Sequence, residues 1–256
     1  MKLTLSVALL SAATLLASPA TLAANRKVEL TAPPPLSKSL NADLAAMPMI
    51  VNPVDAAERR INAALRRFDA SGLKAAKSCK GMDGKPGDWS RSVETPMRGP
   101  GYLSFVIYDS AFCGGAHPDA ATMSIVYDLS SGAPVDWTRL LPDSLTGKLA
   151  LQEGMDGTKM VTLASKRLYA LYLEGYKTGD HRDDKDCMEA VREAGQDGPP
   201  PMMAWLDAKA GGLAVALSLP HYATACADEF VIPLATLRAE GAQPVLLDAI
   251  AAAGGK

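Results

Sequence analysis

Four cysteines constrain the fold of this chain more than any other feature, because they follow an N-terminus typical of exported proteins. An even number of cysteines in an exported chain predicts two disulfides, for which three pairings are possible. We favour Cys79 with Cys113 and Cys187 with Cys226, because sequence neighbours usually lie adjacent in space. Each bridge would close a loop of roughly 35–40 residues and contribute about 4 kcal/mol of stability. Metal binding is the alternative, but no CxxC or Cys/His spacing supports it, so we expect no metal and no cofactor.

The first 23 residues resemble a secretory signal. Lys2 supplies a positive start, Leu3–Leu16 is an apolar run too short to span a bilayer comfortably, and Thr21-Leu22-Ala23 is an acceptable cleavage site. We therefore predict a signal peptide over residues 1–23 and a periplasmic or secreted protein. An uncleaved anchor is the alternative. No later run approaches ~20 apolar residues, so we expect no membrane anchor after cleavage.

The charge balance excludes one class of partner. The formal net charge is −2, and no block of Lys or Arg marks a surface for nucleic acid or an anionic membrane. We expect no nucleic-acid partner. Composition does not determine the oligomeric state.

The distribution of Pro, Gly and apolar residues predicts three segments after the signal. Residues 24–50 read as a flexible or extended lead-in, 51–111 as a module of one helix and a hairpin, and 112–256 as a larger α+β domain. Asn52-Pro53 predicts the start of the helix, with Asn as N-cap and Pro at its first position. Val54 and the apolar residues that recur every three or four positions after it would form the buried face.

Short strands joined by turns predict an antiparallel meander. The strands expected first are Ser90–Met97, Tyr102–Tyr108, Thr122–Leu129 and Val135–Trp137. We expect a long helix over Thr158–Tyr176 and a short one over Asp186–Ala194. Further strands are expected at Met203–Leu206, Leu213–Leu219 and Glu229–Ile232, and helices at Leu234–Arg238 and Val245–Ala252. Helices packed around antiparallel strands define an α+β fold.

The candidate functional residues gather around one glycine-rich turn. Catalytic patterns such as GxSxG, HExxH, GxGxxG and the P-loop are absent. Gly114 and Gly115 permit positive φ, and the proline after His117 favours an extended His117. We predict a shaped loop with His117, Asp119 and nearby Tyr108 available for binding.

Two further histidines could carry chemistry, although packing or simple exposure would explain them as well. His181, with Asp183 or Asp184, could form a metal site or an acid–base pair. His221 lies near Cys226, at the end of a predicted strand.

Several segments, in this order, resemble the extracytoplasmic domain shared by RsiV anti-sigma factors and PdaC-type peptidoglycan deacetylases. The turn Gly114-Gly115-Ala116-His117-Pro118 is the most specific of them. The others, running to the closing strands, are Gly99–Ser104, Tyr127–Gly132, Leu140-Leu141, Leu219–Tyr222 and Phe230–Leu234, with Ile61–Leu65 in the preceding module. The resemblance covers roughly residues 50–240 and makes 112–256 an RsiV-like α+β domain of unknown function.

The resemblance implies an envelope domain without catalysis of its own. In RsiV, the corresponding domain is similar to a receptor that binds lysozyme. We expect neither the sigma-binding part nor the deacetylase domain in this chain, and its cysteines are additions to the pattern. Our leading hypothesis is a non-catalytic binding or interaction domain for lysozyme or a peptidoglycan component. The alternatives are a cell-envelope hydrolase with an acid–base site near His117 and Asp119, and a purely structural envelope protein.

Overall fold

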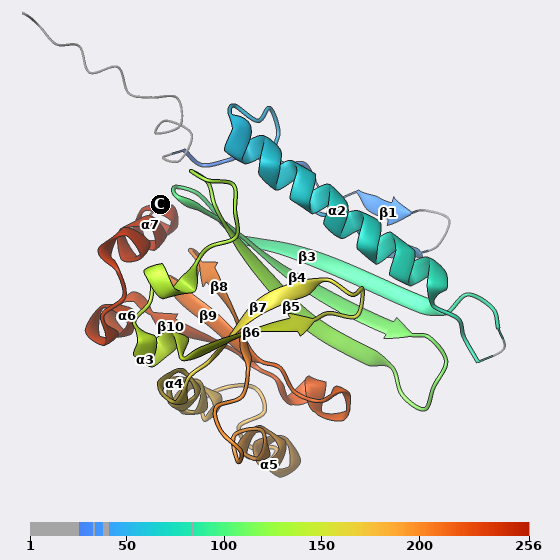
Figure 1. Cartoon of the computed structure of the whole chain (residues 1–256). Helices are drawn as coiled ribbons and strands as arrows, with labels where there is room; N and C mark the ends of the chain where they lie inside the picture. The colour runs from blue at the N-terminus through green and yellow to red at the C-terminus, as the bar shows by residue number, and fades with distance from the viewer. Residues whose placement is uncertain (1–25, 33, 38–40, 83, 256) are drawn as a thin grey trace, which may run out of the picture.

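The computed structural model describes residues 26–255 apart from 33, 38–40 and 83 (Figure 1). The predicted signal peptide, 1–23, lies outside the described residues. Two five-stranded sheets and several helices form the α+β fold predicted from the sequence. Helix α2 lies along one side of the molecule, and helices α4 and α5 lie on the opposite side.

The first sheet has the order β1-β2-β3-β4-β5 and contains the predicted meander. Its strands are β1 Pro35–Ser37, β2 Asn41–Ala45, β3 Asp88–Arg98, β4 Tyr102–Phe112 and β5 Asp119–Asp128. Strands β3, β4 and β5 pair antiparallel over most of their length. Strand β2 joins β3 in parallel, with Leu44 opposite Arg91. Part of the predicted lead-in, 24–50, therefore lies in this sheet, with Leu44 and Met47 buried.

Helix α2, Ala56–Ser78, begins later than predicted. Asn52 was expected to cap it, but Asn52 has a φ of 49° and lies in the left-handed region before the helix. Asp55 is the N-cap instead, and its side chain accepts a hydrogen bond of 2.8 Å from the Glu58 amide. Val54, expected on the buried face, is consequently outside the helix and 57% exposed.

The second sheet has the order β10-β9-β8-β7-β6. Its strands are β6 Lys148–Glu153, β7 Lys159–Ala164, β8 Met202–Asp207, β9 Gly212–Leu217 and β10 Glu229–Pro233. The helix predicted over Thr158–Tyr176 is wrong in its first third, which forms β7. Pairing with β6 decides the conformation of this short apolar run, and Ser165 then caps α4, Lys166–Tyr176, by accepting from two helix amides.

The remaining helices are short. The strand predicted at Val135–Trp137 is wrong, because Trp137–Arg139 forms the 3-10 helix η1, capped by the side chain of Asp136. Helix α5, strands β8 to β10 and helices α6 and α7 confirm the predictions made for those segments. The helix bounds are α3 Asp143–Thr146, α5 Lys185–Glu193, η2 His221–Cys226, α6 Leu234–Glu240 and α7 Pro244–Gly254.

The two sheets meet where β8 lies against the face of the first sheet. Strand β7 pairs with β8 only at Leu163 and Met202, which leaves main-chain groups of β8 without a strand partner. Two buried serines of the first sheet bond to them. Ser124 donates to the Ala204 carbonyl at 3.0 Å, and Ser104 accepts from the Leu206 amide at 3.2 Å. These bonds satisfy buried polar groups and fix the contact between the sheets.

One core cluster contains residues from both sheets and from α2, α4 and α7. The predicted division between 51–111 and 112–256 falls before the last residue of β4, Phe112, and would separate β4 from β5, its neighbour in the same sheet. The division into those segments stays a prediction.

Candidate binding groove

The strands of the first sheet are long enough to extend past the second sheet. Strands β3 and β4 have 11 residues each and β5 has 10, whereas β8 and β9 have 6. Beyond the contact with β8, the ends of β3, β4 and β5 therefore leave one face of the sheet without a strand above it. This face forms the floor of a groove.

The floor consists of two rows of side chains that run across the three strands. Ser92, Tyr108 and Thr122 occupy one row, and Ser90, Ser110 and Ala120 occupy the next. Neighbouring strands lie about 4.8 Å apart, and every second residue of a strand points to the same face. The register thus places these polar side chains side by side on one surface.

The other wall comes from the second sheet and from η2. It contains Leu217, Ser218, Leu219, Thr224, Ala227 and, from β6, Gln152. The Ser218 hydroxyl donates to the Gln152 side-chain oxygen and joins the two parts of this wall. The disulfide between Cys187 and Cys226 attaches the end of η2 to α5. The groove encloses about 560 Å³, within the range of small-molecule sites.

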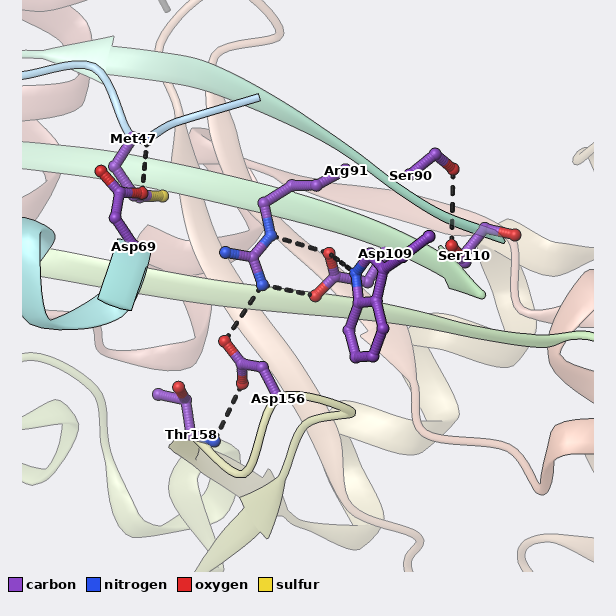
Figure 2. Close-up of polar contacts among 9 residues, drawn as sticks. Met47, Asp69, Ser90, Arg91, Asp109, Ser110, Asp156 and Thr158 are labelled. Carbon is purple, nitrogen blue, oxygen red and sulfur yellow. Dashed lines mark hydrogen bonds and ion pairs between the residues drawn. The ribbon is translucent and has the colours of Figure 1, made fainter. Parts of the chain in front are cut away.

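The opposite face of the same strands carries a buried ion network (Figure 2). Arg91 donates to both carboxylate oxygens of Asp109, at 2.7 and 2.9 Å, and to Asp156 at 3.0 Å. The three side chains have no exposed surface. Burial opposes the charge of Arg91, but the hydrogen bonds and charges of Asp109 and Asp156 outweigh burial and raise the pKa of Arg91. The guanidinium therefore stays charged.

This network connects three elements that are distant in sequence. Asp156 lies in the turn between β6 and β7, and the Arg91 guanidinium is 5.4 Å from the centre of the Phe68 ring on α2. Gly72 of α2 leaves the necessary space, because a Cβ there would lie 2.3 Å from the Nη1 atom of Arg91. The network thus holds α2 and the β6–β7 hairpin against the back of the groove floor. Motif spacing did not predict this network; the alternation of Trp89 and Arg91 with serines in β3 is the signal that the sequence contains.

The end of the groove at Tyr108 is acidic. Tyr108 donates a 2.7 Å hydrogen bond to Glu229 on β10. Partial burial, together with the nearby carboxylates of Glu94 and Asp207, raises the pKa of Glu229, although the bond from Tyr108 opposes the shift. Burial, then the hydrogen bond and charge of Glu229, with smaller contributions from Glu94 and Asp207, raise the pKa of Tyr108, so its hydroxyl remains protonated.

The glycine-rich loop lies at the far end of the same strands. Gly114 and Gly115 have φ values of 77° and 157°, and the disulfide between Cys79 and Cys113 ties the loop to the end of α2. His117 and Asp119 are both exposed. Asp119 pairs with Ala111 one position before the groove row of Ser110 and Ala120.

The structure brings the predicted site residues together only in part. Tyr108 lies in the groove, whereas the loop with His117 lies beyond its end. Within the described part of the chain, His117 forms no hydrogen bond or ion pair, so no partner orients it as an acid or a base. The roles predicted for these residues stay predictions.

His181 has a different partner from those expected. Its Nδ1 lies 2.5 Å from an oxygen of Asp228, and its amide donates to the other oxygen at 3.2 Å. The bond to Asp228 raises the pKa of His181, with smaller contributions from Asp184 and Asp180. Because Asp228 is 47 residues away, sequence spacing could not identify it. The side chain of His221 lies outside the described part of the molecule.

Two general features of the described residues bear on function. No three of their His, Cys, Asp or Glu side chains are grouped as a metal site would require. None of their helices combines the length and apolarity that crossing a bilayer demands.

No protein-family model and no curated protein matches this chain. Among solved structures, it is similar to a DUF3298 family protein from Pseudomonas aeruginosa PAO1. The sequences are 15% identical, the match covers 76% of this chain and 72% of the other, and the TM-score is 0.41. DUF3298 is the RsiV/PdaC-type domain. The similarity is distant, and membership of the family stays an expectation.

Proposed function

We propose that this protein is an extracytoplasmic binding domain of the cell envelope and that it recognises a component of the cell wall through the groove. The observation that carries the proposal is the groove itself, a space of about 560 Å³ whose lining combines polar side chains with apolar surface. Recognition of a ligand requires such a concave surface with convergent polar groups.

The compartment is supported by the two disulfides, which persist in oxidising surroundings and are rare in the cytosol. Their positions also suit a binding role. One bridge fixes the glycine-rich loop at the end of the floor, and the other fixes η2 in the opposite wall. A groove held in one shape loses less conformational entropy when it binds a ligand.

The test measures retention of the purified protein by insoluble peptidoglycan, with immobilised lysozyme as the competing partner. We expect retention by peptidoglycan and its loss in Ala120→Trp, whose indole would fill the groove. Ala251→Trp, on the exposed side of α7, is the matched control and should be retained like the unmodified protein.

Three results would contradict the proposal. Retention by lysozyme alone would identify a wall-directed protein as the partner. Turnover of peptidoglycan that His117→Ala abolishes would support the hydrolase hypothesis. The absence of retention on either material would favour a structural role.

A further inference from the structure

Seven of the 16 residues that line the groove carry a hydroxyl group. Those with an alcohol group are Ser90, Ser92, Ser110, Thr122, Ser218 and Thr224, and Tyr108 and Gln152 add a phenol and an amide. A hydroxyl both donates and accepts hydrogen bonds, so a row of hydroxyls suits a ligand whose own groups do the same.

Three of these hydroxyls are free to bond to a ligand. Ser90 donates to the Ser110 carbonyl, and Ser218 donates to Gln152. By contrast, the hydroxyls of Ser92, Ser110 and Thr122 have no hydrogen-bond partner among the residues that the structure describes. They extend across β3, β4 and β5 in two neighbouring rows of the floor.

The charges around the groove disfavour an anionic ligand. Among the lining residues, Arg91 is the sole cation, and its buried guanidinium binds Asp109 and Asp156 on the other face of the sheet. Glu229 bonds to Tyr108 at one end of the groove, and the carboxylates of Glu94 and Asp207 lie near both residues. A phosphate or carboxylate would have to enter this negative field without a basic partner, at a net electrostatic cost.

Apolar surface forms a larger part of the lining than polar surface does. Leu217, Leu219 and Ala120 contribute it beside the hydroxyls, and the half-buried Tyr108 ring adds an aromatic face. A lipid or another fully apolar ligand would leave the floor hydroxyls without partners, which is unfavourable for buried polar groups. The ligand must therefore combine many hydroxyl or amide groups with C–H surface and carry no negative charge.

Resting on the proposed function, we infer that the groove binds an uncharged saccharide chain, such as the N-acetylated amino-sugar backbone of peptidoglycan, rather than its peptide stems or anionic polymers. Ser92, Ser110 and Thr122 bond to the sugar hydroxyls and amides, and Tyr108 presents its ring to the C–H surface. The neighbouring carboxylates exclude anions from the site.

Calorimetric titration of the purified protein tests this inference with three soluble probes. They are a tetramer of N-acetylglucosamine, the matched glucosamine tetramer with charged amines, and a free stem peptide with its carboxylates. We expect the N-acetylated tetramer to bind with an affinity that stays the same between about 50 and about 500 mM NaCl, because a neutral ligand is not screened by salt.

Paired variants locate the site. Thr122→Val and Ser92→Ala each remove one hydroxyl and should weaken binding by about 3- to 10-fold, the loss of one polar contact. Tyr108→Phe keeps the ring and should bind like the unmodified protein, whereas Tyr108→Leu removes the ring and should weaken binding to a similar extent. The controls are Ser78→Ala at the end of α2 and Tyr102→Phe in the same strand as Tyr108, and both should bind like the unmodified protein. Melting temperatures establish that each variant is folded.

Distinct outcomes overturn the inference. Tighter, salt-sensitive binding of the glucosamine tetramer would mean that the acidic residues select the ligand, and binding of the stem peptide would assign the site to peptides. Binding of the N-acetylated tetramer that persists in folded Thr122→Val and Ser92→Ala would place it elsewhere. If insoluble peptidoglycan retains the protein and the tetramer does not bind, the inference fails and the proposed function stands. If neither interacts, both fail.

Discussion

At the residue scale, the Arg91 network shows why the groove floor keeps its shape. A charged side chain without exposed surface is tolerated only when ion pairs and hydrogen bonds replace water. Asp109 and Asp156 do this for two nitrogens of Arg91. Its Nη1 atom has no hydrogen-bond partner in the described structure and lies beside Gly72 of α2. The network of Arg91, Asp109 and Asp156 therefore fixes the arrangement of these side chains at some cost in stability. Removing one of its members alone should strongly destabilise the protein.

We expect Asp109→Ala to lower the free energy of unfolding by about 3–5 kcal/mol, because it leaves the Arg91 charge buried with one carboxylate fewer. Urea unfolding measures the change. Asp119→Ala, which removes an exposed carboxylate from the neighbouring strand, is the control and should change stability by no more than about 0.5 kcal/mol. Equal effects of the two substitutions would contradict the role assigned to the network.

Gly114 provides a second prediction at this scale. Its φ is 77°, and a Cβ there would lie 2.9 Å from the Lys80 carbonyl oxygen. We expect Gly114→Val to lower stability by roughly 1–3 kcal/mol, because a β-branched residue is strained at this φ. His117→Ala, in the same loop, removes no hydrogen bond within the described structure and should have the smaller effect. Equal melting temperatures for Gly114→Val and the unmodified protein would refute the shaped loop.

At the scale of elements, capping and pairing decide where segments begin. Asp55 and Glu58 stand three residues apart, and Glu58 also accepts from the Val54 amide at 2.8 Å and binds Arg26. These bonds satisfy amides that a helix start leaves free. The connector between α4 and α5 is likewise held in place, because His181 in this connector bonds to Asp228.

The start of α2 can be tested with two substitutions. Asp55→Ala should lower stability by about 1 kcal/mol, the usual effect of losing an N-cap. Asn52→Gly keeps the positive φ and should leave stability nearly unchanged, because Asn52 lies outside the helix. Thermal unfolding distinguishes the two positions, and the reverse order of effects would restore Asn52 as the cap.

The bond between His181 and Asp228 makes the stability of this connector depend on pH. Since the pKa of His181 is raised in the folded state, the stabilisation is fully present below about pH 6.5, the unfolded value, and is lost as pH rises through the folded value. We expect His181→Gln to destabilise the protein more at pH 5.5 than at pH 9. Urea unfolding of both proteins at about these two pH values measures the difference, and a loss that is the same at both would exclude the ion pair.

At the scale of the whole molecule, the two disulfides fix opposite sides of the groove. They close separations of 34 and 39 residues, and no free cysteine remains in the described chain. The pairing inferred from sequence neighbours is confirmed. Adjacent placement holds here because α5 packs against η2, and because the ends of α2 and β4 meet at Gly87.

Thiol titration of the denatured, unreduced protein should detect essentially no free thiol. Replacing Cys187 and Cys226 together by serine should lower stability by up to about 4 kcal/mol, because the unfolded chain regains its freedom. The same double substitution should weaken ligand binding, since it frees one end of η2. The pair Cys79 and Cys113 provides the comparison for the other side of the groove. Unchanged stability after loss of either bridge would contradict a structural role.

The local signals in the sequence predicted much of this fold. Alternation of apolar and polar residues identified β3, β4 and β5, and glycine placement identified the turn at 114–115. Local signals failed where a neighbour decides the outcome. The segment of β7 carries a short apolar run that suits either a helix or a strand, and only its pairing with β6 resolves this ambiguity.

By itself, the sequence determined the α+β class and the shaped loop, and it favoured one of three disulfide pairings, because each depends on residues close in the chain or on the adjacency of neighbouring segments. Only the tertiary structure decided where the groove lies. Its floor results from a difference in strand length between two sheets, and its walls come from β6, β9 and η2. The partners of Arg91 and His181 were likewise decided by packing, since burial forces a charge to pair with the carboxylate that the fold brings near, at any separation along the chain.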